Sequence, residues 1–163
     1  MIWLCRSGRN SVYLQYFLDE EKLFLPWEGF RIDLSSFNSN EDLKCFISKE
    51  RSDASKTAIA TWAGQIRAFV HGMQLDDLVL IPHQGSKLYT LAKIIGDYHF
   101  ADDNPHQLWH SRKICVLNEP IPRSLFSQSL QYSMGAYRTV FRIKDEAGVL
   151  ATIKALQSDL KHL

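Results

Sequence analysis

The sequence predicts a single α+β domain built on a curled antiparallel sheet. Its 163 residues fit one domain, and a hydrophobic content of 45% is enough for a sizeable core. Short strand-like runs are mixed with helix-like segments without regular β-α-β alternation, which favours an antiparallel sheet.

The chain opens with strand-like segments. Residues 2–6 are a short apolar run, which predicts a strand. Residues 12–17 fit a helix or a strand equally well. Residues 23–27 predict a second strand, which ends at the turn formed by Trp27, Glu28 and Gly29.

Two helices are expected next. Asn40 is a suitable cap, and Leu43 and Ile47 then fall on one face of a first helix. A second helix is expected to begin near Ser55. Gly64 interrupts it, at a cost of about 1 kcal/mol relative to alanine.

After Asp77 the spacing of the apolar residues changes from that of helices to that of strands. Residues 78–82 predict a buried strand, and residues 83–86 a hairpin turn leading into a return strand over 88–95. Residues 109–117 predict a further strand, and residues 137–143 a last one.

Residues 145–162 predict a C-terminal helix, because Val149, Ile153 and Leu156 recur at helical spacing. We expect this helix either to end the domain or to lead into an effector domain. The whole chain, residues 1–163, is otherwise expected to form one domain, with no linker or internal repeat.

The charge and the N-terminal segment bound the class of protein. The formal net charge is +1, which neither announces nor excludes a nucleic-acid binder, because a local basic face is sufficient. No apolar run approaches the roughly 18 residues of a membrane span, and the start lacks the layout of a signal peptide. We therefore expect a cytoplasmic protein without a membrane partner.

The three cysteines, Cys5, Cys45 and Cys115, are far apart in the sequence. An odd number without any Cys-x-x-Cys pair predicts buried free thiols rather than disulfides or a zinc site. No metal and no other cofactor is expected.

The chain offers few sequence motifs of enzymes. Glu20-Glu21-Lys22 has the Glu-x-Lys spacing of the common restriction nucleases, but it lies in a charge run, for which a solvated face is the simpler interpretation. The chain contains no Gln-x-Lys, no Walker loop, no Gly-x-Ser-x-Gly and no His-Glu-x-x-His. His99, His106 and His110 are close in sequence and could bind a metal, but a solvated loop is the simpler interpretation. The sequence therefore predicts that the chain is not an enzyme.

Aromatic residues beside small or polar residues favour a binding function. Trp27 precedes Glu28 and Gly29, Trp62 precedes Ala63 and Gly64, and Tyr98 follows Gly96 and Asp97. A base stacked on such a ring gains about 1–3 kcal/mol, and a neighbouring Asp or Gln can read its edge by hydrogen bonds.

An ordered series of short motifs extends over nearly the whole chain. It resembles the N-terminal domain of Mrr-like modification-dependent restriction endonucleases. The motifs are Trp3-Leu4-x-Arg6-Ser7-Gly8, Leu25-Pro26-Trp27-Glu28-Gly29, Trp62-Ala63-Gly64-Gln65-Ile66, Phe69-Val70-His71-x-Met73, Asp77-x-Val79, Pro82, Ile95-Gly96-Asp97-Tyr98, Arg112-Lys113, Ile121-Pro122-Arg123, Phe126-x-Gln128, Ser133-Met134-Gly135-Ala136 and Thr139-Val140-Phe141-Arg142-Ile143. One departure is Leu75-Asp76-Asp77, where the family usually has a small residue, Gly and Asp, which is expected to loosen the turn.

The resemblance implies a PUA-like fold, a small curled antiparallel β-barrel flanked by helices and related to the EVE and YTH reader domains. It implies a non-catalytic module that binds a modified, typically methylated, base of DNA in an aromatic pocket. In that setting a separate nuclease or motor domain is the effector of a modification-dependent restriction system.

The base pocket that we expect in such a module contains five residues. Trp62 and Tyr98 would be facing walls, and Trp27 a third side or a lid. Asp97 would accept a hydrogen bond from an exocyclic amine, and Gln65 would pair with ring donors and acceptors. Candidates for phosphate contacts are the cations Arg6, Arg9, Arg67, Lys93, Arg112, Lys113 and Arg123.

Two alternatives remain open at this point. The same fold could bind RNA or a small nucleotide and regulate an attached effector. An enzyme that uses the histidine loop and a metal is the third possibility, and it has the least support from the sequence.

Overall fold

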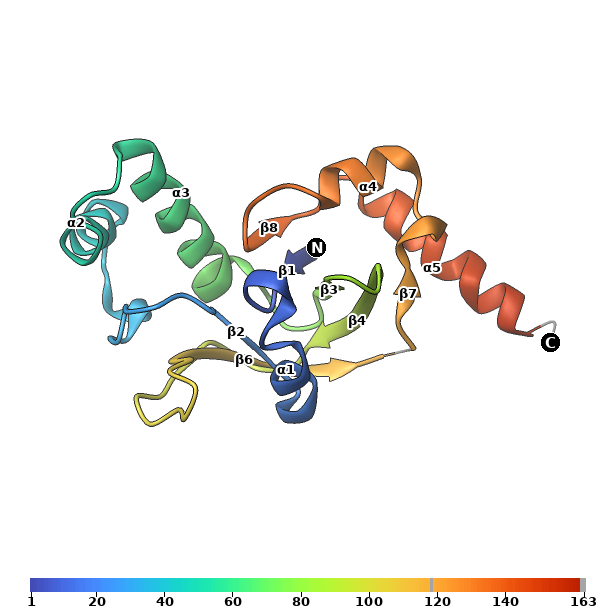
Figure 1. The fold of residues 1–163 in the computed structure, drawn as a ribbon, viewed down its shortest axis with the longest axis horizontal. Helices are drawn as coiled ribbons and strands as arrows, with labels where there is room; N and C mark the ends of the chain where they lie inside the picture. The colour runs from blue at the N-terminus through green and yellow to red at the C-terminus, as the bar shows by residue number, and fades with distance from the viewer. Residues whose placement is uncertain (118, 162–163) are drawn as a thin grey trace.

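A curled sheet forms the centre of the protein, in a computed structural model that describes residues 1–117 and 119–161 (Figure 1). Within these residues the strand order is β2-β6-β4-β3-β1-β8, with β5 paired to β6 and β7 paired to β4. The strands are β1 (Ile2–Cys5), β2 (Lys22–Phe24), β3 (Leu78–His83), β4 (Leu88–Ile94), β5 (His99–Phe100), β6 (His110–Val116), β7 (Ile121–Pro122) and β8 (Val140–Arg142). Because β2 and β8 are the two ends of this order, the sheet is an open, half-barrel surface.

The pairing of β1 differs from the prediction. β1 runs parallel to β3, with Trp3 opposite Val79, and antiparallel to β8 on its other side. The other described strand pairs are antiparallel, as expected. A strand at the start of the chain thus lies inside the sheet, which local sequence patterns do not reveal.

Helices and short helical turns connect the strands. They are α1 (Leu14–Glu20), α2 (Asn40–Glu50), α3 (Lys56–Arg67), α4 (Gln128–Met134) and α5 (Glu146–Lys161), with the 3₁₀ turns η1 (Arg9–Ser11), η2 (Leu34–Ser36) and η4 (Arg123–Leu125) and the π turn η3 (Ala68–Gly72). The ambiguous segment 12–17 belongs mainly to α1.

The helix caps follow the expected chemistry, with one shift. Ser55 accepts a hydrogen bond from the backbone N–H of Ala58 and caps α3 as predicted. The cap of α2 is Ser39 rather than Asn40, because the Ser39 hydroxyl accepts from the N–H of Asp42. Gly64 lies within α3, and the helix continues through it.

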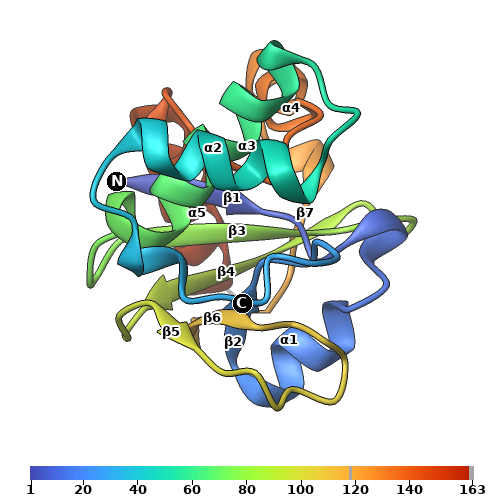
Figure 2. The same ribbon diagram turned by 90° about the vertical axis from the view of Figure 1, so that its left-hand side faces the viewer.

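Helices lie on both sides of the sheet, α2 and α3 on one and α4 and α5 on the other (Figures 1 and 2), and a hydrophobic core packs against each face. In β1, Trp3 and Cys5 belong to the core shared with α1, α2 and α3, whereas Ile2 and Leu4 belong to the core shared with α4 and α5. β3 alternates in the same way. Burial on both faces explains why the sequence of these strands is almost continuously apolar.

The C-terminal helix packs by the residues that predicted it. Val149 and Ile153 of α5 are buried in the second core, and Leu156 is half-buried. Residue 162, the expected end of this helix, lies outside the described residues. Among the helices described, none is long and apolar enough to cross a membrane.

The turn before β3 is tightly held, contrary to the expectation of a looser turn. Asp76 takes a left-handed conformation, φ 73°, at the position where the sequence resemblance led us to expect a glycine. The Asp77 carboxylate accepts hydrogen bonds from the Trp3 indole N–H (3.0 Å) and the Gln74 backbone N–H (2.9 Å). This fixes the segment that leads from η3 into the sheet.

The cysteines are only partly as predicted. Cys5 is buried, but Cys45 and Cys115 are exposed. Cys45 lies on the outer face of α2, and Cys115 alternates with buried Ile114 on β6, so both side chains point to solvent. All three thiols are free.

Candidate functional site

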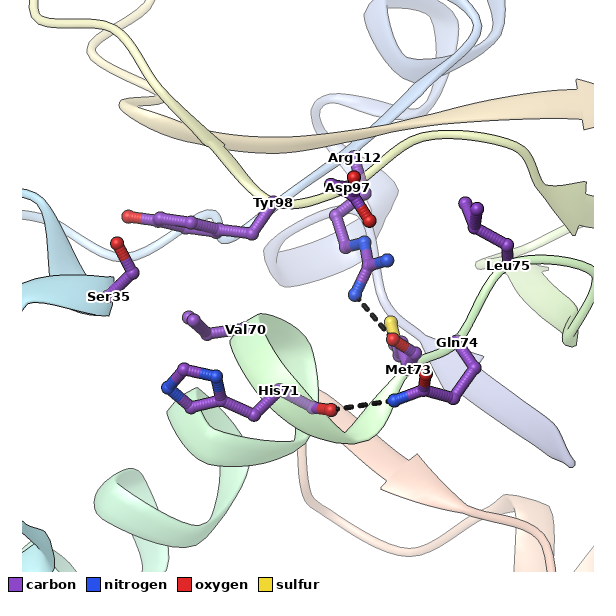
Figure 3. Close-up of a pocket in the computed structure, with 9 residues that line it drawn as sticks. All are labelled: Ser35, Val70, His71, Met73, Gln74, Leu75, Asp97, Tyr98 and Arg112. Atoms are coloured by element: carbon purple, nitrogen blue, oxygen red, sulfur yellow. Dashed lines mark hydrogen bonds between the residues drawn. The ribbon is translucent and has the colours of Figure 1, made fainter.

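A cavity of about 490 Å³ lies between the loop after β4, the end of η3 and the turn η2 (Figure 3). Asp97 and Tyr98, both predicted base-pocket residues, line it together. Figure 3 shows Val70 and His71 on the opposite side from Tyr98. The other lining residues are Ser35, Met73, Gln74, Leu75 and Arg112. We refer to this space as the Asp97–Tyr98 cavity.

A chain of hydrogen bonds fixes the ring of Tyr98. Nε2 of His110 is 2.7 Å from the carbonyl oxygen of Phe30, which can only accept, so Nε2 carries the proton. Nδ1 is then the acceptor for the Tyr98 hydroxyl at 2.7 Å, and that oxygen accepts from the Leu34 N–H at 3.0 Å. The hydroxyl of Tyr98 therefore both donates and accepts a hydrogen bond within the protein. A ligand in the cavity would contact the ring face instead.

Burial keeps this chain neutral. It lowers the pKa of His110 to about 4, against smaller opposing effects of the Phe30 carbonyl and Asp33. It also raises the pKa of Tyr98. Both groups thus stay uncharged around neutral pH, and the wall of the cavity is a rigid aromatic surface.

Arg112 forms the floor of the cavity. It is 2% exposed, and its guanidinium donates to the carbonyl oxygens of Phe69 (3.1 Å), Met73 (2.7 Å) and Gly96 (3.0 and 3.1 Å). Instead of meeting a phosphate at the surface, as the sequence suggested, this side chain ties η3 to the loop after β4. The carbonyl oxygens of Phe69, Met73 and Gly96 have no partner in a strand, and Arg112 supplies their hydrogen bonds. Arg112 therefore has a structural role.

The exposed side chain of Asp97 stands next to this floor. Among the described residues it makes no hydrogen bond, and the nearby charge of Arg112 is held in place by backbone carbonyls. The chain can approach closely here because residue 96 is glycine: a Cβ at Gly96 would lie 2.9 Å from Cβ of Lys113. Asp97 thus offers a free hydrogen-bond acceptor at the cavity wall.

The opposite wall is built by an irregular end of α3. In η3 the Met73 N–H bonds to the Ala68 carbonyl, an i to i+5 bond of 2.8 Å. This π turn frees the Phe69 carbonyl for Arg112 and places His71 beside the cavity. Such turns are often found at functional sites. The sequence contains no signal for it, and His71 and Gln74 were therefore missed as cavity residues.

The two predicted tryptophans lie elsewhere. Trp27 packs edge-on against Phe30 and donates its indole N–H to the Thr139 hydroxyl at 3.2 Å. The guanidinium carbon of Arg51 lies 4.6 Å from the ring centroid of Phe30 and 5.6 Å from that of Trp62. Phe30 and Trp62 thus both lie near Arg51, and the expected arrangement of Trp62 facing Tyr98 is not present among the described residues.

Gln65 is also occupied. It is 7% exposed, and its side-chain oxygen accepts from the backbone N–H groups of Thr139 (2.8 Å) and Val140 (3.0 Å). The residue lines a different cavity, beside β8. Its structural role is to cap the free edge of β8.

The predicted phosphate contacts are distributed over several surfaces. Arg67 lines a smaller cavity of about 170 Å³ that shares Val70 and His71 with the Asp97–Tyr98 cavity. Lys93 and Lys113 lie on neighbouring strands β4 and β6, and Arg9 is exposed in η1. Arg6 and Arg123 line a third cavity at the other end of β3.

The histidines of the loop before β6 do not converge. His106 packs against Tyr16, with ring centroids 4.4 Å apart, and His110 belongs to the hydrogen-bond chain above. Over residues 1–117 and 119–161, no three His, Cys, Asp or Glu side chains are close enough to hold a metal ion.

The fold and this site define a small α+β protein with helices on both faces of a half-barrel sheet. A family described as a domain of unknown function (DUF8426) matches residues 2–144, and the chain belongs to this family. No curated protein matches the chain.

Solved structures of bacterial proteins show some overlap. A crystal structure of a Pseudomonas putida protein, a Northeast Structural Genomics Consortium target, has a TM-score of 0.46 and 12% identity, covering 93% of this chain and 99% of its own. An NMR structure from Rhodopseudomonas palustris, from the same consortium, has a TM-score of 0.40 and 16% identity, covering 93% and 90%.

Proposed function

We propose that this chain is a non-catalytic recognition module that binds a modified base of DNA in the Asp97–Tyr98 cavity. The observation that carries the proposal is that these two residues, which we expected to contact a base, line one cavity. Arg112, which lines the same cavity, is held in place by hydrogen bonds to backbone carbonyls. The half-barrel sheet would then be a variant of the PUA-like barrel.

The size and composition of the cavity suit a flipped base. Its volume of about 490 Å³ is in the range of small-ligand pockets, roughly 300–1,000 Å³. The Tyr98 ring offers a stacking surface worth about 1–3 kcal/mol, comparable to the cost of extruding a base. Val70 and Met73 supply apolar surface for a methyl group.

Asp97 supplies polar selectivity in this proposal. Its free carboxylate would accept a hydrogen bond from the exocyclic amine of cytosine or adenine. A methyl group alone changes affinity by about 1–3 kcal/mol, so selectivity would be modest without a polar contact. The carboxylate supplies that contact and fixes the orientation of the base. A nuclease or motor domain would act on the recognised DNA, as an attached or separate effector of a restriction system.

Two variants test the site with matched controls. Leu75 is 53% exposed at the cavity, so Leu75→Trp should block it without disturbing the core, and Leu125→Trp, at a 49% exposed leucine elsewhere, is its control. Asp97→Asn removes the acceptor charge. Asp76→Asn controls for it, because asparagine also tolerates the left-handed conformation there.

The experiment is fluorescence anisotropy with duplexes that differ in a single base: unmodified, N6-methyladenine, 5-methylcytosine and 5-hydroxymethylcytosine. We expect a preference of about tenfold or more for one modification, lost in Leu75→Trp and Asp97→Asn and kept in both controls. Equal binding of all four duplexes would contradict the proposal. Binding of RNA or a nucleotide instead, with the same loss in Leu75→Trp, would replace it by the alternative of a nucleotide sensor.

A further inference from the structure

The cavity lined by Arg6 and Arg123 has a volume of about 370 Å³ and lies at the far end of β3 from the Asp97–Tyr98 cavity. The β3–β4 hairpin, the start of η4 and the end of α4 enclose it. Arg6, Lys87 and Arg123 are among its lining residues, and no acidic side chain of the described residues is. In a chain with 19 Lys and Arg against 18 Asp and Glu, this is a local excess of positive charge.

Arg6 is held in position by backbone carbonyls. Nε donates to the Arg138 carbonyl (3.0 Å), and Nη2 donates to those of Met134 (3.0 Å) and Ala136 (2.7 Å). Nη1 has no partner among the described residues. Neutral carbonyls fix the side chain without neutralising it, and burial lowers the pKa of Arg6. A half-buried, oriented cation with two free N–H groups is suited to bind an anion.

Tyr89 lines the same cavity as these cations. Its ring is 5% exposed and packs edge-on against Phe126, with centroids 5.6 Å apart. Burial raises the pKa of Tyr89, and the charges of Arg123 and Arg6 oppose this effect. The hydroxyl makes no hydrogen bond within the described residues, so it can donate one.

The backbone links the other two cations. Lys87 takes a left-handed conformation, φ 56°, at the end of the hairpin, and its carbonyl accepts from the Arg123 N–H at 2.9 Å. His83 also lines the cavity, but burial lowers its pKa, so the positive charge comes from the Arg and Lys side chains.

We propose that this cavity binds the phosphate group of a phosphorylated ligand. Arg6, Lys87 and Arg123 supply charge that matches a phosphate, and Nη1 of Arg6 and the Tyr89 hydroxyl supply directed donors. The phosphate belongs either to a free nucleotide or to a nucleic-acid backbone, since both present the same group. This inference does not depend on base recognition, because the two cavities share no lining residue.

The test compares ligands that differ in a phosphate. Calorimetric titration of the full chain uses inorganic phosphate, adenosine monophosphate and adenosine. We expect the monophosphate to bind at least about tenfold more tightly than adenosine, and inorganic phosphate to compete with it. Measurable binding of both adenosine and its monophosphate with equal affinity would overturn the proposal.

Variants assign the binding to this cavity. Arg123→Gln and Lys87→Gln are exposed positions that leave the core intact, and each should weaken the monophosphate by about tenfold; Lys144→Gln, an exposed cation outside the cavity, should not. Unchanged affinity in both cavity variants would overturn the proposal. Loss of phosphate binding in Leu75→Trp would also overturn it, because Leu75 lines only the Asp97–Tyr98 cavity of the two. If Leu75→Trp loses base selectivity but keeps phosphate binding, the two sites are separate.

A binding measurement with duplex DNA identifies the source of the phosphate. If free phosphates do not bind but Arg123→Gln weakens an unmodified duplex and lowers the salt dependence of its binding, the phosphate belongs to the backbone and the assignment stands. If neither free phosphates nor duplex affinity respond to Arg123→Gln, the proposal is wrong.

Discussion

The hydroxyl of Tyr98 donates to Nδ1 of His110 over 2.7 Å, and this bond requires a neutral histidine. Protonation of His110 would add a proton at Nδ1, and this proton would face the hydroxyl proton of Tyr98. The wall of the Asp97–Tyr98 cavity therefore depends on the charge state of a buried ring.

The first prediction concerns pH. Burial lowers the pKa of His110 from about 6.5 in the unfolded chain to about 4, so its contribution to stability is complete above pH 6.5 and is lost as the pH falls towards 4. This difference corresponds to roughly 3 kcal/mol. Urea unfolding across this range should show a steeper acid loss in the wild type than in His110→Gln. An NMR titration in which His110 protonates near pH 6.5 would contradict the prediction.

The second prediction concerns Gln65. Gln65→Leu leaves the N–H groups of Thr139 and Val140 without their acceptor, so we expect a loss of about 1–3 kcal/mol in the free energy of unfolding. Hydrogen exchange at Val140 should accelerate with it. Gln15→Leu, which removes an exposed side-chain bond to Asp19, serves as control and should change stability little.

The third prediction contrasts two glycines. A Cβ at Gly64 meets no atom within 4 Å, so Gly64→Ala should stabilise α3 by about 1 kcal/mol. At Gly96 the added Cβ would meet Lys113 at 2.9 Å, and Gly96→Ala should lower the melting temperature. Thermal denaturation of both variants checks this, and a destabilising Gly64→Ala would refute the account of that helix.

The fourth prediction concerns thiol reactivity. Burial raises the pKa of Cys5 to about 12, while Cys45 and Cys115 are exposed. Because the thiolate is the reactive form, a thiol reagent should label Cys45 and Cys115 in the native protein and Cys5 only after unfolding. Mass spectrometry of the labelled peptides measures this directly, and rapid native labelling of Cys5 would contradict it.

The main strands and helices could be predicted because their sequences are locally consistent. Residues 78–82 and 88–95 are apolar runs on either side of a turn, and β3 and β4 follow them closely. Ser55 begins α3 where a capping residue precedes a periodic apolar face. The parallel pairing of β1 with β3 could not be predicted, since it joins segments separated by more than 70 residues.

The candidate site was predictable only in part. Asp97 and Tyr98 were found because both stand at a strand end beside a glycine. Trp62 and Gln65 have the same kind of sequence environment, but tertiary contacts with Arg51 and with β8 occupy them. Arg6 and Arg112 look like surface cations in the sequence, and only the structure shows the unpaired loop carbonyls that hold them.

The position of β1 also has a consequence for biosynthesis. Its partners on the two sides are Leu78–His83 and Val140–Arg142, so β1 is completed by a strand that is synthesised after the other described strands of the sheet. At roughly 5–20 residues per second, the apolar segment Ile2–Cys5 waits some 7 to 30 seconds for its second neighbour. During translation this segment is an exposed strand edge, and we expect the nascent chain to need protection from aggregation until β8 has emerged.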